Sequence, residues 1–189
     1  MTDYFVLLDQ PRSPWLDPEN LKQVFHQKTL RDHPDAQAHD SSQAIAEANF
    51  ADVNEAYRVL RDPKRRLHHL LTLEKQTPSS ATAEIPREIE ELFSVVAALT
   101  RKSDEVIQRR ALATTALGRS LMKGAIAEVE ADVRQALARL SKLHSEALTQ
   151  LQEARESWTA AKLHALYLQF SYLTRWMSQL EEKRLQLNV

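Results

Sequence analysis

The chain has 189 residues and a formal net charge of −1, and 43% of its residues are apolar. This length allows one domain of ordinary size or two small ones, and so small a net charge gives no general reason to expect nucleic acid or an anionic membrane as a partner. The absence of cysteine excludes disulfides and thiolate-held metal or iron–sulfur sites, and the presence of only two glycines argues against a fold of sheets and tight turns.

The first predicted helix begins at Pro18 and ends at about Arg31. Asp17 suits the N-cap position, and Pro18 suits the first helical position, where a missing N–H costs nothing. Apolar residues at helical spacing predict one buried stripe, formed by Leu21, Val24 and Phe25. The remaining face is mostly basic and carries Lys22, His26, Lys28 and Arg31.

A loop containing His33-Pro34-Asp35 is predicted to follow this helix, because Pro34 forces the residue before it out of the α region. A second amphipathic helix comes after a polar stretch and ends at Asp62-Pro63. Its stripe is formed by Phe50, Val53, Asn54, Tyr57 and Leu60. We therefore expect two antiparallel helices joined by the His33-Pro34-Asp35 loop.

A polar linker is predicted at residues 76–86, where proline, serine and threonine are concentrated. It separates an N-terminal domain, residues 1–75, from a C-terminal domain, residues 87–189. The sequence pattern predicts three long helices with short connections in the C-terminal part, an arrangement typical of an antiparallel bundle. The expected helices span about 86–100, 103–151 and 155–186, and Ser103 is the predicted N-cap of the second.

Several short stretches together resemble a known family. They are Asp3-Tyr4-Phe5, Leu16-Asp17, His33-Pro34-Asp35, Asn54-Glu55-Ala56-Tyr57 and Gln179-Leu180-Glu181-Glu182-Lys183. The two helices joined by the His33-Pro34-Asp35 loop resemble the J-domain, the module by which J-protein co-chaperones dock on DnaK-type chaperones and trigger their ATP hydrolysis. The whole set is similar to HscB, the J-protein of iron–sulfur cluster assembly. The resemblance implies an all-α fold, with an N-terminal J-domain followed by a C-terminal three-helix bundle.

The resemblance also implies a function. The protein would stimulate the ATPase of a DnaK/HscA-type Hsp70 chaperone and deliver a client, which in this family is the iron–sulfur cluster scaffold protein. The implied chaperone-binding residues are Lys22, His26, Lys28, Arg31, His33, Pro34 and Asp35. Asp35 would reach a cationic group of the chaperone, and His33 would either bond to the partner or hold the loop. The basic helix would steer the encounter with an acidic groove, an effect that salt screens.

The client-binding candidates are Leu92, Phe93, Val96 and Phe170. Bundle packing is an alternative role for them, since each helix of a three-helix bundle buries about one face. In HscB, the first helix of the C-terminal domain carries a patch rich in leucine and glutamate that binds the scaffold protein. The segment 90–99 keeps its apolar residues but lacks most of the later acidic residues of that patch. Asp32, Lys28 and Ala36 also depart from the family pattern. A J-like adaptor with another client and weak or no ATPase stimulation is therefore the alternative function.

Other classes of function have little support in the sequence. The chain lacks a glycine-flanked serine and a glycine-rich phosphate loop, so we expect neither an enzyme nor a cofactor. No histidine pair has the spacing of a metal motif, so no metal site is expected. A basic helix can bind DNA, but the acidic residues elsewhere make a nucleic-acid partner unexpected. The N-terminus does not resemble a signal peptide, and no apolar run approaches the roughly 20 residues that span a bilayer, so we expect a cytoplasmic protein without a membrane partner.

Overall fold

The computed structural model describes residues 2–31, 43–75 and 86–188, and within these ranges all regular structure is helical. The chain divides into two compact units. Unit 1 contains residues 1–83 and 149–167, and unit 2 contains residues 84–148 and 168–189. The all-α prediction is confirmed. The predicted linker at 76–86 lies almost wholly outside the described residues, and the domain boundaries beside it remain a prediction.

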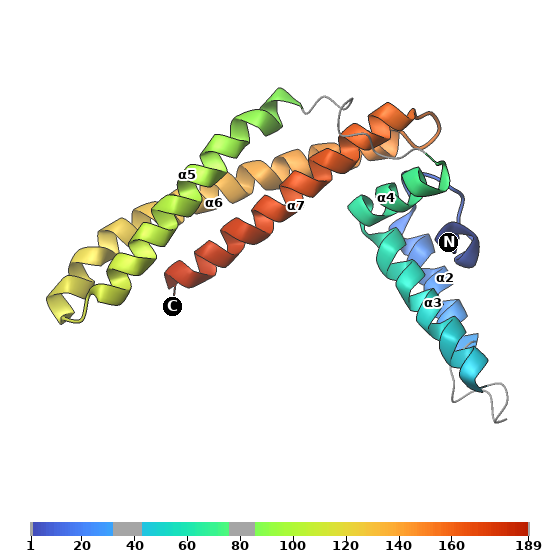
Figure 1. Cartoon of the computed structure of the whole chain (residues 1–189), viewed down its shortest axis with the longest axis horizontal. Helices are drawn as coiled ribbons and strands as arrows, with labels where there is room; N and C mark the ends of the chain where they lie inside the picture. The colour runs from blue at the N-terminus through green and yellow to red at the C-terminus, as the bar shows by residue number, and fades with distance from the viewer. Residues whose placement is uncertain (1, 32–42, 76–85, 189) are drawn as a thin grey trace. The chain divides into compact units, whose positions relative to one another are not determined.

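Unit 1 is built on a helical hairpin. Its helices are α1 (Tyr4–Leu7), α2 (Pro18–Arg31), α3 (Gln43–Arg61) and α4 (Pro63–Leu73). Helices α2 and α3 lie side by side and α4 turns back beside them (Figure 1). The predicted start of α2 is confirmed, because Asp17 Oδ1 accepts hydrogen bonds from the backbone N–H groups of Glu19 and Asn20, at 2.9 and 3.3 Å.

The core of unit 1 lies between α1, α2, α3 and α4. Its buried apolar residues include Phe5, Leu8, Leu21, Val53, Ala56, Leu60, Leu67 and Leu70. The rings of Phe25 and Tyr57 stack at 4.1 Å between centroids, which joins α2 to α3. The turn that follows α6 belongs to the same unit, and there the Arg155 guanidinium lies 5.3 Å from the centroid of the Trp15 ring.

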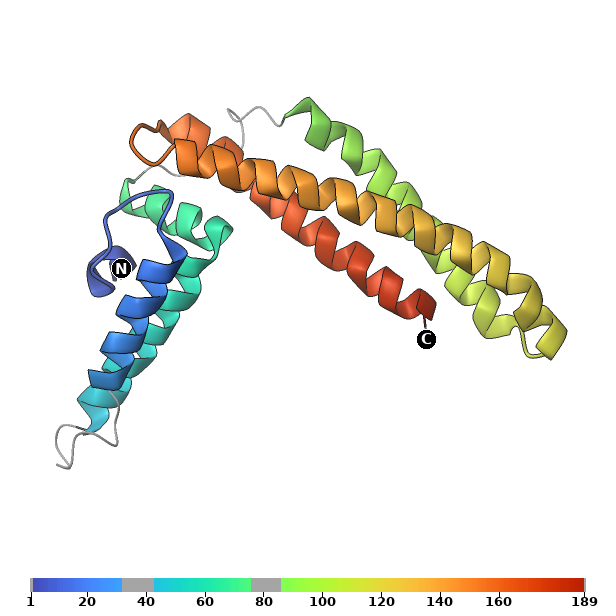
Figure 2. The same cartoon turned by 180° about the vertical axis from the view of Figure 1, so that it is seen from behind.

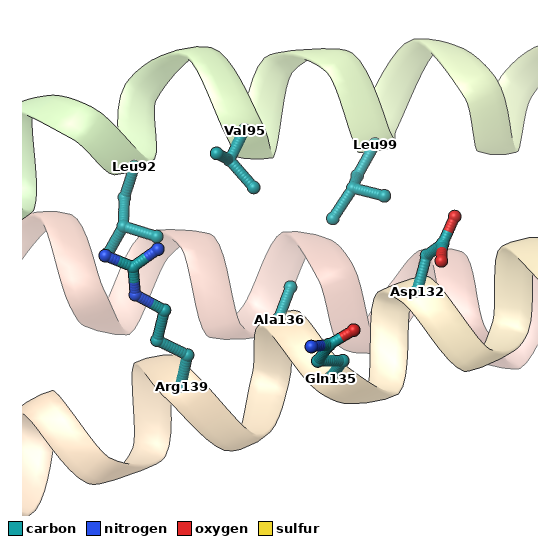
Figure 3. Close-up of a pocket in the computed structure, with 7 residues that line it drawn as sticks. All are labelled: Leu92, Val95, Leu99, Asp132, Gln135, Ala136 and Arg139. Atoms are coloured by element: carbon teal, nitrogen blue, oxygen red, sulfur yellow. The ribbon is translucent and has the colours of Figure 1, made fainter.

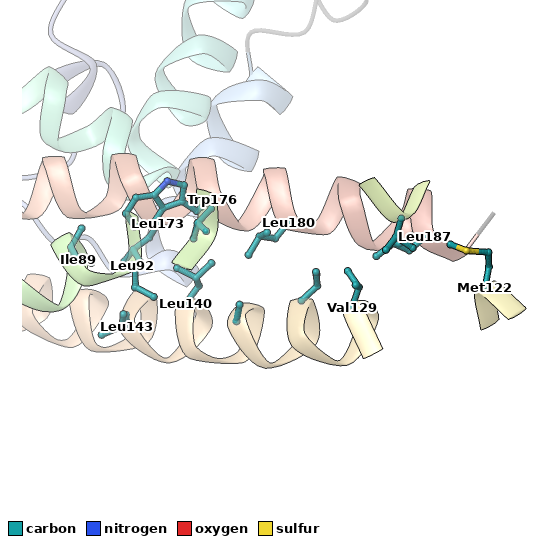
Figure 4. Close-up of a cluster of buried hydrophobic side chains, with 14 residues drawn as sticks. Ile89, Leu92, Met122, Val129, Leu140, Leu143, Leu173, Trp176, Leu180 and Leu187 are labelled. Carbon is teal, nitrogen blue, oxygen red and sulfur yellow. The ribbon is translucent and has the colours of Figure 1, made fainter. Parts of the chain in front are cut away.

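Unit 2 is a three-helix bundle, as predicted. It consists of α5 (Arg87–Leu112) and the larger parts of α6 (Ala116–Glu153) and α7 (Ala160–Asn188). The three helices lie alongside one another in both views (Figures 1 and 2). Their facing stripes form a continuous apolar core, which includes Ile89, Leu92, Val129, Leu140, Leu173 and Leu180 (Figure 4).

The predicted helix break near Ser103 is wrong. Helix α5 continues to Leu112, and the chain turns at residues 113–115 instead. Ser103 does not cap a new helix, because it is buried and its hydroxyl donates to the Leu99 carbonyl, at 2.7 Å, one turn earlier in α5. The cap of α6 is Thr115, whose Oγ1 accepts a hydrogen bond from the backbone N–H of Gly118 at 3.0 Å.

Candidate functional site

The predicted chaperone-binding site lies on α2 and the loop after it. His33, Pro34 and Asp35 fall within residues 32–42, outside the described residues, so their roles remain predictions. Lys22 and His26 are four residues apart on α2 and both are exposed, which puts them on the same open face of the helix. Arg31 is exposed at the last residue of the helix.

Lys28 is placed differently from the other basic residues of α2. It follows Leu21 by seven residues and Val24 by four, so it lies on the apolar stripe. Only 17% of its side chain is exposed, and Nζ lies 2.7 Å from Asp9 Oδ2. The charge of Lys28 is therefore paired within unit 1. The exposed basic face of α2 contains Lys22 and His26 but not Lys28.

Two buried polar residues of α4 hold the N-terminal segment against the hairpin. The guanidinium of buried Arg66 donates to the carbonyls of Pro14 and Leu60, at 2.8 and 2.6 Å. Burial lowers the pKa of Arg66 to about 10, against the raising effect of the Asp62 carboxylate, so it stays charged at neutral pH. These contacts link segments 52 and 6 residues apart in the chain, and helical periodicity alone does not reveal them.

His69 is the second of these residues. Its Nε2 accepts a hydrogen bond from the backbone N–H of Tyr4 at 3.1 Å, and its ring stacks on the Tyr4 ring at 4.5 Å between centroids. Because Nε2 is an acceptor, the ring is neutral in this arrangement. Burial lowers the pKa of His69 below its ordinary value of 6.5, although the charge of Asp3 opposes the shift.

His69 should make unfolding depend on pH. The unfolded chain binds a proton at His69 below pH 6.5, whereas the folded state binds it only at the lower folded pKa. The contribution of His69 to the free energy of unfolding is therefore complete above pH 6.5 and decreases as the pH falls below it. We expect His69→Gln to remove this part of the pH dependence in urea unfolding, and His68→Gln, at the exposed neighbour, to retain it. Equal pH dependence in the His69→Gln variant and the natural chain would contradict this assignment.

Most of the client-binding candidates are core residues. Leu92, Val96 and Phe170 are buried, in agreement with the alternative role of bundle packing. Phe93 is 41% exposed, and its ring meets those of Tyr172 and Trp176 edge to face, at 4.9 and 4.8 Å between centroids. Of the four candidates, only Phe93 presents a large part of its side chain to a partner.

Two grooves lie on either side of α5. One, of about 220 Å³, lies between α5 and α7 and includes Phe93, Tyr172, Arg175 and Trp176 among its lining residues. The other, of about 320 Å³, lies between α5 and α6 (Figure 3). It is lined by Leu92, Val95, Leu99, Asp132, Gln135, Ala136 and Arg139. Beside these grooves, α5 exposes apolar surface at Phe93 and at Val95, which is 39% exposed.

Residues 2–31, 43–75 and 86–188 contain no cluster of three or more histidine, aspartate or glutamate side chains able to hold a metal ion. Among the helices of these ranges, none combines the length and apolar character needed to cross a bilayer.

Comparison with known proteins identifies a domain in the N-terminal part of the chain. The sequence model of the DnaJ domain matches residues 3–69. DnaJ homolog subfamily B member 2 of Mus musculus is 38% identical over 66 residues, which cover 35% of this chain and 19% of that protein. Chaperone protein DnaJ of Campylobacter hominis is also 38% identical over 66 residues, covering 35% of this chain and 17% of that protein. The chain thus spans about a fifth of the length of these relatives.

Residues 3–69, with the hairpin of α2 and α3 at their centre, therefore match a J-domain. Chaperone HscB from Vibrio cholerae matches 98% of this chain and 99% of its own, with a TM-score of 0.60 and 22% identity. The human co-chaperone HscB matches 97% of this chain and 85% of its own, with a TM-score of 0.50 and 20% identity. The fold of the whole chain is that of HscB.

Proposed function

We propose that this protein is a co-chaperone that stimulates ATP hydrolysis by a DnaK/HscA-type Hsp70 chaperone and delivers a client to it in the cytoplasm. The observation that carries the proposal is the J-domain match over residues 3–69, because this range contains His33-Pro34-Asp35 and the basic helix α2. The HscB fold over nearly the whole chain supports a client of the same kind, the iron–sulfur cluster scaffold protein.

In this proposal Lys22, His26 and Arg31 direct α2 to an acidic surface of the chaperone, and Asp35 acts on it directly. The exposed positions of the first three residues support that role, since surface charges accelerate encounter between oppositely charged proteins. Lys28 has an indirect role, because its ion pair with Asp9 helps to hold α2 against the N-terminal segment.

Single-turnover ATP hydrolysis by DnaK/HscA-type chaperones tests the proposal. We expect the natural chain to accelerate hydrolysis, Asp35→Asn to abolish the acceleration, and Lys22→Glu to reduce it by about tenfold or more at low salt. Lys28→Met is the matched control, since it removes a charge that Asp9 already pairs, and it should retain most of the stimulation.

A failure of stimulation would favour the alternative function. If the folded natural chain leaves the hydrolysis rate of every such chaperone unchanged, the co-chaperone mechanism is wrong, and an adaptor with a different client becomes the better interpretation. If Lys28→Met reduces stimulation as strongly as Lys22→Glu, the separation of these two basic residues is wrong.

A further inference from the structure

The aromatic stack between α2 and α3 reaches the surface of unit 1. The rings of Phe25 and Tyr57 lie 4.1 Å apart between centroids, and both side chains are only half-buried. The Phe25 ring also lies 5.6 Å from the ring of exposed His26, which belongs to the basic face of α2. The stack is therefore the place where the basic face of α2 meets α3.

The Arg61 guanidinium lies beside this stack, at the end of α3. Arg61 is exposed, and its Cζ atom is 5.7 Å from the centroid of the Tyr57 ring. A cation over the face of an aromatic ring is attracted to it, so this contact orders the guanidinium before a partner binds. Helix α3 thus contributes a positioned cation next to the basic face of α2.

Helix geometry puts Lys22 and Arg61 on the same side of the hairpin. Helices α2 and α3 run in opposite directions, as the order of colours along them shows (Figure 2). Lys22 precedes Phe25 by three residues and Arg61 follows Tyr57 by four, so both lie about one turn from the stack, toward the same end of the hairpin. Lys22, His26 and Arg61 therefore share one surface, which we call the two-helix basic surface.

The carboxylates close to these residues in the chain act at helix starts. Glu19, one turn before Lys22, lies in the first turn of α2, where the helix dipole favours a negative charge. Asp62, next to Arg61, is the N-cap of α4 and accepts a hydrogen bond from the backbone N–H of Arg65 at 3.0 Å. Each carboxylate has a local structural role, and the group that holds Arg61 is the Tyr57 ring.

We propose that Arg61 is a further chaperone-contact residue, so that the acidic surface of the chaperone contacts α3 as well as α2. The inference rests on the proposed function, which assigns an acidic chaperone surface to the basic residues of α2. Charge complementarity carries it, since Arg61 adds a second positive charge to the surface that presents Lys22. The Phe25–Tyr57 stack adds aromatic area at the centre of the contact.

The concentration of this protein that half-saturates its effect on single-turnover ATP hydrolysis tests the role of Arg61. We expect Arg61→Glu to raise this concentration by about tenfold or more at low salt, and by less at high salt, because salt screens the charge. The maximal acceleration should stay nearly unchanged, since Asp35 is the residue proposed to act on the chaperone directly. Arg61→Lys should retain most of the natural affinity, because it keeps the positive charge.

Arg58→Glu is the matched control for the change in net charge. Arg58 is also an exposed arginine of α3, but its Nη1 lies 3.5 Å from Glu55 Oε2. It follows Tyr57 directly, so it points about 100° away from Tyr57 around the helix. We expect this variant to change the half-saturating concentration by less than about threefold. Circular dichroism verifies that all the variants are folded.

Failure of this inference and failure of the proposed function give different results. If the natural chain accelerates hydrolysis and Arg61→Glu behaves like Arg58→Glu, Arg61 is not a contact residue, and the proposed function stands. If Arg61→Lys is as weak as Arg61→Glu, the positive charge is not what Arg61 contributes, and the inference is wrong. If the folded natural chain accelerates hydrolysis by none of these chaperones, the proposed function and the inference fall together.

Discussion

Arg66→Met is expected to lower the free energy of unfolding by about 3 kcal/mol. The substitution keeps most of the buried aliphatic volume but removes two hydrogen bonds to the carbonyls of Pro14 and Leu60. Hydrogen bonds from a charged donor contribute about 1.5–3 kcal/mol each, and in the variant the two carbonyls stay buried without this donor. Removing a buried cation offsets part of this loss, so the expected decrease in the free energy of unfolding is smaller than the two hydrogen-bond contributions added together.

Urea unfolding of the full chain, followed by circular dichroism, measures this effect. Arg65→Met is the matched control, because Arg65 is the neighbouring arginine of α4 and its side chain is exposed. We expect it to change the free energy of unfolding by less than about 0.5 kcal/mol. Similar losses for the two variants would show that the carbonyl contacts of Arg66 do not stabilise unit 1.

Leu92→Ala is expected to cost about 3 kcal/mol of stability, and Phe93→Ala about 1 kcal/mol. Leu92 is buried in the core of unit 2, where replacing leucine by alanine leaves a cavity and typically costs 2–5 kcal/mol. Phe93 is partly exposed, so it loses mainly its edge contacts with Tyr172 and Trp176, which are worth about 0.5–1.5 kcal/mol.

The same pair of variants separates a core role from a client-binding role. Under the proposed function, titration with the iron–sulfur cluster scaffold protein should give weaker binding for folded Phe93→Ala. Leu92→Ala should affect binding only as far as it unfolds unit 2, which its urea midpoint reports. Natural stability combined with lost scaffold binding in Leu92→Ala would make Leu92 a contact residue and contradict the core assignment.

Local features of the sequence predicted the architecture well. Asp17 and Pro18 identify the start of α2 because capping depends on residues next to one another in the chain. The apolar periodicity of the C-terminal part predicted a three-helix bundle, since each helix must bury one stripe. The break near Ser103 was mispredicted because a buried serine can bond back to its own helix as well as cap a new one.

The candidate site depended more on tertiary structure. A helical pattern gives the face of a residue but not what covers that face, so it did not separate buried Leu92 from exposed Phe93. Lys28 was grouped with the basic face, yet its spacing from Leu21 places it on the apolar stripe. Only the tertiary structure shows that Asp9 pairs its charge there.

The sequence by itself determined the all-α class, the start of α2 and the His33-Pro34-Asp35 motif, because these depend on residues close together in the chain. Only the tertiary structure decided which apolar and charged side chains remain available to partners. That availability depends on contacts between segments far apart in the sequence, as in the Arg66 contact with Pro14 and the Lys102 contact with Glu128.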